Sequence, residues 1–152
     1  MKPEKSIMAN TSGNNKSTSL DKKDVREKGL NYCRERLSSL GWHVTDAADN
    51  ELGIDFIARN KDDSRFVKIK VRTLSKHAAA SIGSSLDKVV GDFWVVVTEI
   101  ATTPSAFVLP SQEVKKVANR DKGGERQYWL ETRDYRQEKF HEAWEQIGRG
   151  DA

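Results

Sequence analysis

The sequence predicts an α/β fold, in which a mixed sheet of four to five strands is flanked by helices. Apolar side chains recur at helical spacing between residues 30 and 40, and two strand-like runs at 54–58 and 66–71 enclose a polar, turn-rich segment. Residues 93–97, Phe-Trp-Val-Val-Val, are apolar without alternation, which is typical of a central strand covered on both faces. The order of helix, strands and further helices indicates a sheet with helices on its faces.

Composition limits the class of protein. Residues 1–19 are rich in Ser, Asn, Thr and Lys without a hydrophobic period, which indicates a flexible tail before a single domain at 20–152. Of the net charge of +3, the tail carries +2, so the rest carries +1 and only a local patch could indicate nucleic acid. No apolar run is long enough to span a membrane, and the N-terminus has no apolar signal core. We therefore expect a cytoplasmic protein with no membrane partner.

The first helix is expected to begin at Ser19 or Asp21, either of which can cap it, and to end before Gly41. Glu27 extends its core-facing stripe at the N-terminal end, where a charged residue either borders the core or reaches into a site. Cys33, the single cysteine, is expected to be a buried thiol within this stripe. The stripe consists of Leu30, Cys33, Leu37 and Leu40.

Further elements follow from shorter patterns. We expect strands at 42–45, 106–109 and 128–130, a helical turn at 86–90, and a helix from Ser111 to about residue 118, with Ser111 as its N-cap. Apolar residues at i, i+3, i+4 and i+7 predict a closing amphipathic helix. Those residues are Phe140, Ala143, Trp144 and Ile147.

The predicted hairpin at 54–71 contains the candidate site. Side chains alternate between the two faces of a strand, so Lys68, Lys70 and Arg72 share one face of the second strand. On the first strand, alternation places Asp55 opposite its apolar neighbours. One carboxylate and three cations are therefore expected to face the same way on neighbouring strands.

The order of these motifs resembles the PD-(D/E)xK nuclease superfamily, the restriction-endonuclease-like fold, in a small bacterial branch of it. The resemblance covers about residues 25–148 and implies a restriction-endonuclease-like core. It rests on Gly29 and Leu37, Gly41-Trp42-His43-Val44, Gly53-Ile54-Asp55, Lys68-Ile69-Lys70, Trp94-Val95-Val96-Val97, Val108-Leu109-Pro110-Ser111 and the segment from Phe140 to Ile147.

The resemblance implies metal-assisted phosphodiester hydrolysis, in which carboxylates hold Mg²⁺ and a lysine positions the attacking water. By position, Asp55 matches the aspartate and Lys70 the lysine of that site. Two positions depart from the pattern: Lys68 stands where the family has Glu or Gln, and Leu30 stands where its helix has Glu. Pairing of Lys68 with Asp55 would put an ammonium in the place of the metal.

Three hypotheses follow. In the first, the protein acts on or binds nucleic acid, chiefly DNA, through Lys68, Lys70 and Arg72, with its nuclease chemistry weakened or lost, as in a pseudo-enzyme. In the second, it is an active Mg²⁺-dependent endonuclease in which Glu27 joins Asp55 as a metal ligand. In the third, the scaffold is an immunity or regulatory module that binds a protein partner or a second copy of itself.

Overall fold

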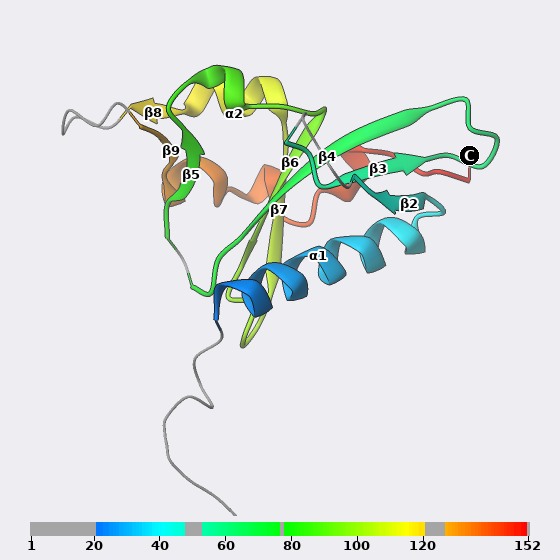
Figure 1. Ribbon diagram of the computed structural model, residues 1–152, viewed down its shortest axis with the longest axis horizontal. Helices are drawn as coiled ribbons and strands as arrows, with labels where there is room; N and C mark the ends of the chain where they lie inside the picture. Colours follow the sequence, from blue (N-terminus) through cyan, green and yellow to red (C-terminus); the bar gives the residue numbers. More distant parts are fainter. Residues whose placement is uncertain (1–20, 48–52, 77, 121–126, 152) are drawn as a thin grey trace, which may run out of the picture.

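The computed structural model describes residues 21–47, 53–76, 78–120 and 127–151; the predicted tail at 1–19 lies outside them. The main sheet has five strands in the order β2-β3-β4-β6-β7 (Figure 1). Strands β4 and β6 run parallel and the other neighbouring pairs are antiparallel, so the sheet is mixed, as predicted. The strands are β2 (His43–Asp46), β3 (Phe56–Arg59), β4 (Phe66–Thr73), β6 (Phe93–Thr98) and β7 (Ser105–Pro110).

Helix α1 (Lys22–Ser39) lies along one face of this sheet (Figure 1). Its N-cap is Asp21, one of the two predicted positions, whose side chain accepts a hydrogen bond from the Asp24 N–H at 2.8 Å. Beyond the helix, Gly41 has a φ of 89°, the left-handed conformation in which glycine commonly ends a helix. The predicted start and stop signals are both confirmed.

The helix lies close against the sheet at Gly29. A Cβ atom at this position would overlap the Thr73 side chain on β4. Absence of a side chain therefore lets the N-terminal half of α1 approach the end of β4, and the stripe of Leu30, Cys33 and Leu37 is buried against the strands. Burial strongly raises the pKa of the Cys33 thiol, which agrees with its predicted packing role.

Strand β6 is covered on both faces, as its unbroken apolar run predicts. Val95 and Val97 belong to the core cluster that includes α1, whereas Trp94 and Val96 belong to a second cluster on the opposite face. A small sheet in the order β5-β9-β8 contributes to that second cluster. Its strands are β5 (Ala80–Gly83), β8 (Asn119–Arg120) and β9 (Tyr128–Leu130).

Short helical elements pack with the small sheet into the second core cluster, and we call this group of elements the second layer. They are η3 (Leu86–Lys88), α2 (Ser111–Val117) and α3 (Thr132–Tyr135). The prediction that Ser111 caps α2 is wrong, because the N-cap is Pro110 and the Ser111 hydroxyl instead donates to the Gly91 carbonyl at 2.8 Å. None of the helices in the described ranges combines the length and apolarity that crossing a bilayer requires.

The predicted closing helix is also wrong. The segment contains two short 3-10 turns, η4 (Glu138–Phe140) and η5 (Trp144–Gln146). Between them His141 forms a β-bridge with Phe107, and Glu142 has a φ of 48°, which no α-helix accommodates. Pairing with the edge of β7 thus replaces the helical hydrogen bonds, although the four apolar residues of the motif are buried as expected.

Candidate functional site

Asp55 lies where β3 separates from β4. The two strands pair from Phe56 opposite Ile69 onward, and the Asp55 N–H still donates to the Ile69 carbonyl at 2.8 Å. The Asp55 carboxylate then takes the place of a strand partner: its Oδ2 accepts the Val71 N–H at 2.7 Å. The residue is only 8% exposed. A strand predicted to begin at residue 54 therefore begins at Phe56, and the divergence of the strands makes room for a carboxylate.

Two cations hold this carboxylate. Arg26 of α1 donates from Nη2 to Asp55 Oδ1 at 2.8 Å, and Lys70 Nζ lies 3.9 Å from Oδ2. Charge-assisted contacts of this kind are stronger than neutral hydrogen bonds. Burial is the main cause that lowers the pKa of Lys70; Arg72 and Arg26 lower it further, while Asp55 acts in the opposite direction.

Arg72 lies beside Asp55 and Lys70, and a contact with the small sheet holds it there. Its Nε donates to the Ser81 carbonyl of β5 at 3.0 Å, and its guanidinium carbon lies 5.9 Å from the centre of the Trp94 ring. Burial lowers the pKa of Arg72, an effect that the nearby Asp55 opposes. The side chain therefore connects the main sheet to the small sheet.

A cleft of about 570 Å³, which we call the Asp55 cleft, opens between α1, the end of β4 and the small sheet. Among the described residues that line it, four carry positive charge and one carries negative charge. The cations are Lys22, Arg26, Lys70 and Arg72, and the anion is Asp55. Low-dielectric walls strengthen the field of such an excess of charge, so the cleft is suited to an anionic ligand.

The predicted strip of three cations is divided by the structure. Lys70 and Arg72 line the cleft with Asp55, whereas Lys68 is exposed and is not among the lining residues. Lys68 stands opposite Ile57 in the strand register, and its backbone N–H donates to Asp92 Oδ2 at 2.8 Å. Within the described part of the chain, Asp55 forms its ion pairs with Arg26 and Lys70 and not with Lys68.

Glu27 lines a smaller pocket of about 210 Å³ that adjoins the same carboxylate. Asp55, Arg26 and Leu30 also line this pocket, and Glu27 itself is exposed at its edge. Leu30, which stands where the resembled family has Glu, is thus placed beside Asp55 but offers no ligand atom. Roles of Asp55, Lys68 and Lys70 in catalysis, and of Asp55 and Glu27 as metal ligands, remain predictions.

The arrangement fits a bound anion better than a bound metal ion. Both oxygens of Asp55 already accept contacts from Arg26, Lys70 and the Val71 N–H. Mg²⁺ at phosphate-handling sites requires one or two accessible carboxylates in addition to substrate and water. Within the described ranges, no three His, Cys, Asp or Glu side chains form a group that could hold a metal ion.

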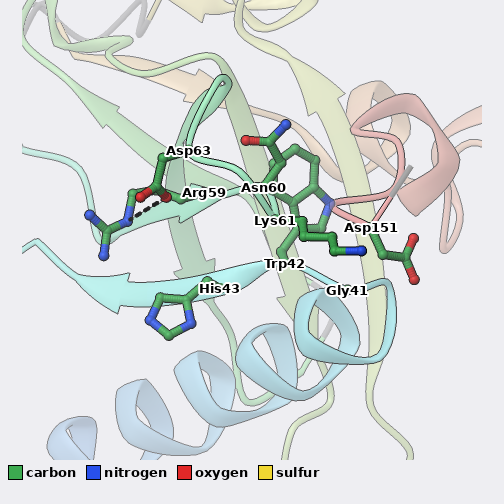
Figure 2. A pocket seen from close by; sticks show the side chains of 8 residues that line it. All are labelled: Gly41, Trp42, His43, Arg59, Asn60, Lys61, Asp63 and Asp151. Carbon is green, nitrogen blue, oxygen red and sulfur yellow. Dashed lines mark ion pairs between the residues drawn. The ribbon is translucent and has the colours of Figure 1, made fainter.

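A third pocket, of about 410 Å³, lies at the other end of the hairpin (Figure 2). It differs from the Asp55 cleft in charge, since two cations and two carboxylates line it. Arg59 and Asp63 pair there with Nε and Oδ1 3.9 Å apart, as the dashed line in Figure 2 marks. The other two charged side chains are Lys61 and Asp151. The described residues that line this pocket therefore carry no excess of charge for an ionic ligand, and the Asp55 cleft is the candidate site.

The main sheet and its flanking helices form a nuclease-like α/β fold, which confirms the predicted fold class. A solved structure that it resembles is that of a bacterial homing endonuclease, I-Ssp6803I, with a TM-score of 0.55. The superposition covers 85% of this chain and 94% of the endonuclease chain at 15% sequence identity, so the likeness shows the fold alone. No family model matches the sequence, and no curated protein matches it either.

Of the charged residues that line the cleft, the sequence predicted that Asp55, Lys70 and Arg72 face the same way, but it did not predict Arg26 and Lys22 beside them. The missed signal was helical spacing: Lys22, Arg26 and Leu30 follow one another at intervals of four, so both cations extend the face that packs on the sheet. Glu27, three residues before Leu30, extends the same face on its other side. The contact of Arg26 with Asp55 spans 29 residues, which no local pattern reveals.

Proposed function

We propose that the protein binds nucleic acid through the Asp55 cleft and holds the phosphodiester backbone there without metal-dependent cleavage. The observation that carries the proposal is the capture of Asp55 by Arg26 and Lys70 in a cleft with four cations. Two further observations support it: the nuclease-like fold, and the homing endonuclease named in the structure that the chain resembles. Membership of the PD-(D/E)xK superfamily is part of the same proposal.

The cleft residues have distinct roles in this proposal. Arg26 and Lys70 neutralise Asp55, which would otherwise repel a phosphate, and a surplus of positive charge remains on their outer sides. Arg72, held by the Ser81 carbonyl, contributes a fixed guanidinium, whose planar donors suit phosphate oxygens. Lys22, exposed at the start of α1, provides a further cation.

Salt dependence tests the proposal. Each phosphate contact releases counterions, so binding of a labelled DNA duplex should weaken linearly on a log–log scale as salt rises. Lys22→Gln should reduce the slope by about 0.9, the value for one duplex phosphate contact. Lys115→Gln is the matched control, because Lys115 is an exposed cation on α2 that is not among the cleft residues. A slope that both variants change equally would contradict binding through this cleft. No DNA binding at low salt would contradict the proposal as a whole and favour the protein-binding hypothesis.

The alternative is an active Mg²⁺-dependent endonuclease, for which the proximity of Glu27 to Asp55 in the smaller pocket is the supporting observation. Plasmid nicking with Mg²⁺ or Mn²⁺ distinguishes the two proposals. We expect no metal-dependent nicking. Cleavage by the wild type that both Asp55→Ala and Lys70→Ala abolish would establish the endonuclease and overturn the binding proposal.

A further inference from the structure

Trp129 lines the cleft, and packing in either core cluster does not account for its large aromatic side chain. On either side of it in β9, Tyr128 and Leu130 pack into the second core cluster. Because side chains alternate along a strand, Trp129 faces the other way, toward the cleft that it lines. It belongs to neither core cluster and is partly exposed.

The other tryptophans show what packing alone would produce. Trp42, Trp94 and Trp144 are 3%, 0% and 7% exposed, respectively, and each is a member of a core cluster. All four tryptophans lie in the described residues, and Trp129 is the one that belongs to neither core cluster and lines the cleft with the excess of cations. Large aromatic side chains placed in this way commonly serve recognition.

The strand register brings Trp129 close to the cations. Ser81 of β5 is its direct partner in the small sheet, and the Ser81 carbonyl accepts the hydrogen bond from Arg72 Nε. Neighbouring strands lie about 5 Å apart, so the indole and the guanidinium are held by adjacent backbone positions. Lys70 extends the positive charge toward Asp55 along β4. A single cleft thus combines an aromatic surface with a track of cations.

We propose that the cleft binds an unpaired nucleic-acid strand, with one base stacked on Trp129 and the adjoining phosphates held by Arg72 and Lys70. This inference rests on the proposed function and names its substrate class. Paired bases inside a duplex are already stacked on both faces, whereas an unpaired base offers a face to an aromatic ring. A positively charged groove with a stacking platform is the arrangement by which proteins hold single strands without reading sequence.

The size and lining of the cleft agree with one nucleotide unit. Its volume of about 570 Å³ lies within the range of pockets that enclose small ligands. Ala79 and Leu74 add apolar surface to the lining of the cleft, and its cations come from α1 and β4. A base and its phosphate therefore meet surfaces of matching chemistry.

Affinity for matched strands tests the inference. We would measure binding of an oligothymidine of roughly 12 nucleotides and of the same strand annealed to its complement, at one salt concentration. The single strand should bind at least about tenfold more tightly than the duplex. Trp129→Leu should weaken single-strand binding about 5- to 100-fold and leave duplex binding within about twofold, because stacking on one base is lost. Trp129→Phe keeps an aromatic ring and should retain most of the affinity.

Intrinsic fluorescence supplies a measurement that does not depend on a folded leucine variant. Oligothymidine should quench the wild-type tryptophan emission and protect it from acrylamide, and Trp129→Phe should remove both changes while the three buried tryptophans still emit. An oligouridine of equal length, measured in the same way, distinguishes RNA from DNA as the strand.

The outcomes separate the two proposals. Equal binding of single strand and duplex, with no effect of Trp129→Leu and no quenching, would overturn this inference but leave salt-dependent backbone binding intact. Failure of both nucleic acids to bind would overturn the proposed function as well. Quenching that persists in Trp129→Phe would place the stacked base elsewhere and also contradict the inference.

Discussion

Asp55 and Glu142 are both carboxylates held by hydrogen bonds within the fold, but the donors that hold them differ in charge. Glu142 accepts from neutral groups at short range: the Tyr32 hydroxyl at 2.6 Å, the Trp144 indole at 2.8 Å and the Ala106 N–H at 3.0 Å. Asp55 accepts one neutral N–H and is otherwise held by Arg26 and Lys70. The first carboxylate is held as part of the packing, and the second neutralises part of a cationic surface.

Location reinforces the difference. Glu142 connects α1, β7 and the C-terminal segment, and among the described residues the cation that pairs with it is Arg36, whose Nε lies 3.8 Å from Oε1. Asp55 connects α1 to the point where β3 and β4 diverge, and a cleft with three more cations than carboxylates opens beside it. A carboxylate satisfied by neutral donors stabilises the fold, whereas one outnumbered by cations leaves positive charge for a ligand.

The largest expected effect comes from Asp55. Asp55→Ala leaves the Val71 N–H without its acceptor and two cations without their partner, so we expect the free energy of unfolding to fall by about 3 kcal/mol, the lower end for a broken buried ion pair. The lower end applies because the Arg26 side chain is 61% exposed. Urea denaturation measures this change.

The same site separates stability from binding. Asp55→Asn keeps the shape and an acceptor but removes the negative charge, so the folded variant should bind DNA more tightly than the wild type in fluorescence anisotropy. Weaker binding by Asp55→Asn, above all in the presence of Mg²⁺, would indicate that the carboxylate recruits a metal and would remove the contrast with Glu142.

Glu142→Gln should lower the free energy of unfolding by about 1.5–3 kcal/mol at neutral pH, because hydrogen bonds to a charged acceptor are lost. Burial alone would raise the pKa of Glu142, but the bonds from Tyr32, Trp144 and Ala106 lower it on balance. With a folded pKa below the ordinary 4.5, the carboxylate stabilises the protein above pH 4.5 and loses this contribution as pH falls through the folded pKa. The deficit of the variant should therefore shrink in acid.

DNA binding is the control for this variant. Glu142 is not among the residues of the Asp55 cleft, so Glu142→Gln should bind DNA with the affinity of the wild type wherever both proteins are folded. A change in affinity would show that the two carboxylates are coupled through α1, on which Tyr32 and Arg26 both lie.

Strong local patterns predicted much of the fold. Three elements are encoded by residues that lie close together in the sequence. They are α1 with its caps and apolar stripe, the hairpin, and β6 with its unbroken apolar run. The prediction of a closing helix failed because the same apolar spacing also suits two 3-10 turns that bury the same residues. The bridge between His141 and Phe107 favours the 3-10 turns over the helix. Because these two residues are 34 positions apart, no local sequence pattern predicts the bridge.

Of the candidate site, the sequence could predict only which side chains share a face of the hairpin. Alternation places Asp55, Lys68 and Lys70 on one face, but it cannot say which lysine meets the carboxylate. The register decides this in favour of Lys70, because Lys68 stands opposite Ile57 and Phe56 stands opposite Ile69. Trp129 lies in a strand of three residues, too short for its alternation to signal a cleft-facing ring.

The smallest expected effect distinguishes Lys70 from an ordinary surface lysine. Burial lowers its pKa, so the ammonium that faces the cleft should lose its proton below its ordinary pKa of 10.5, and the affinity for DNA should decline with it as pH rises. Lys70→Arg keeps the charge and should remove this decline, a difference of at most about 1 kcal/mol, or fivefold. Anisotropy titrations across the alkaline range, with Lys115→Arg as the matched control, measure it. An identical decline in the wild type and Lys70→Arg would show that Lys70 neutralises Asp55 but adds no positive charge for a ligand.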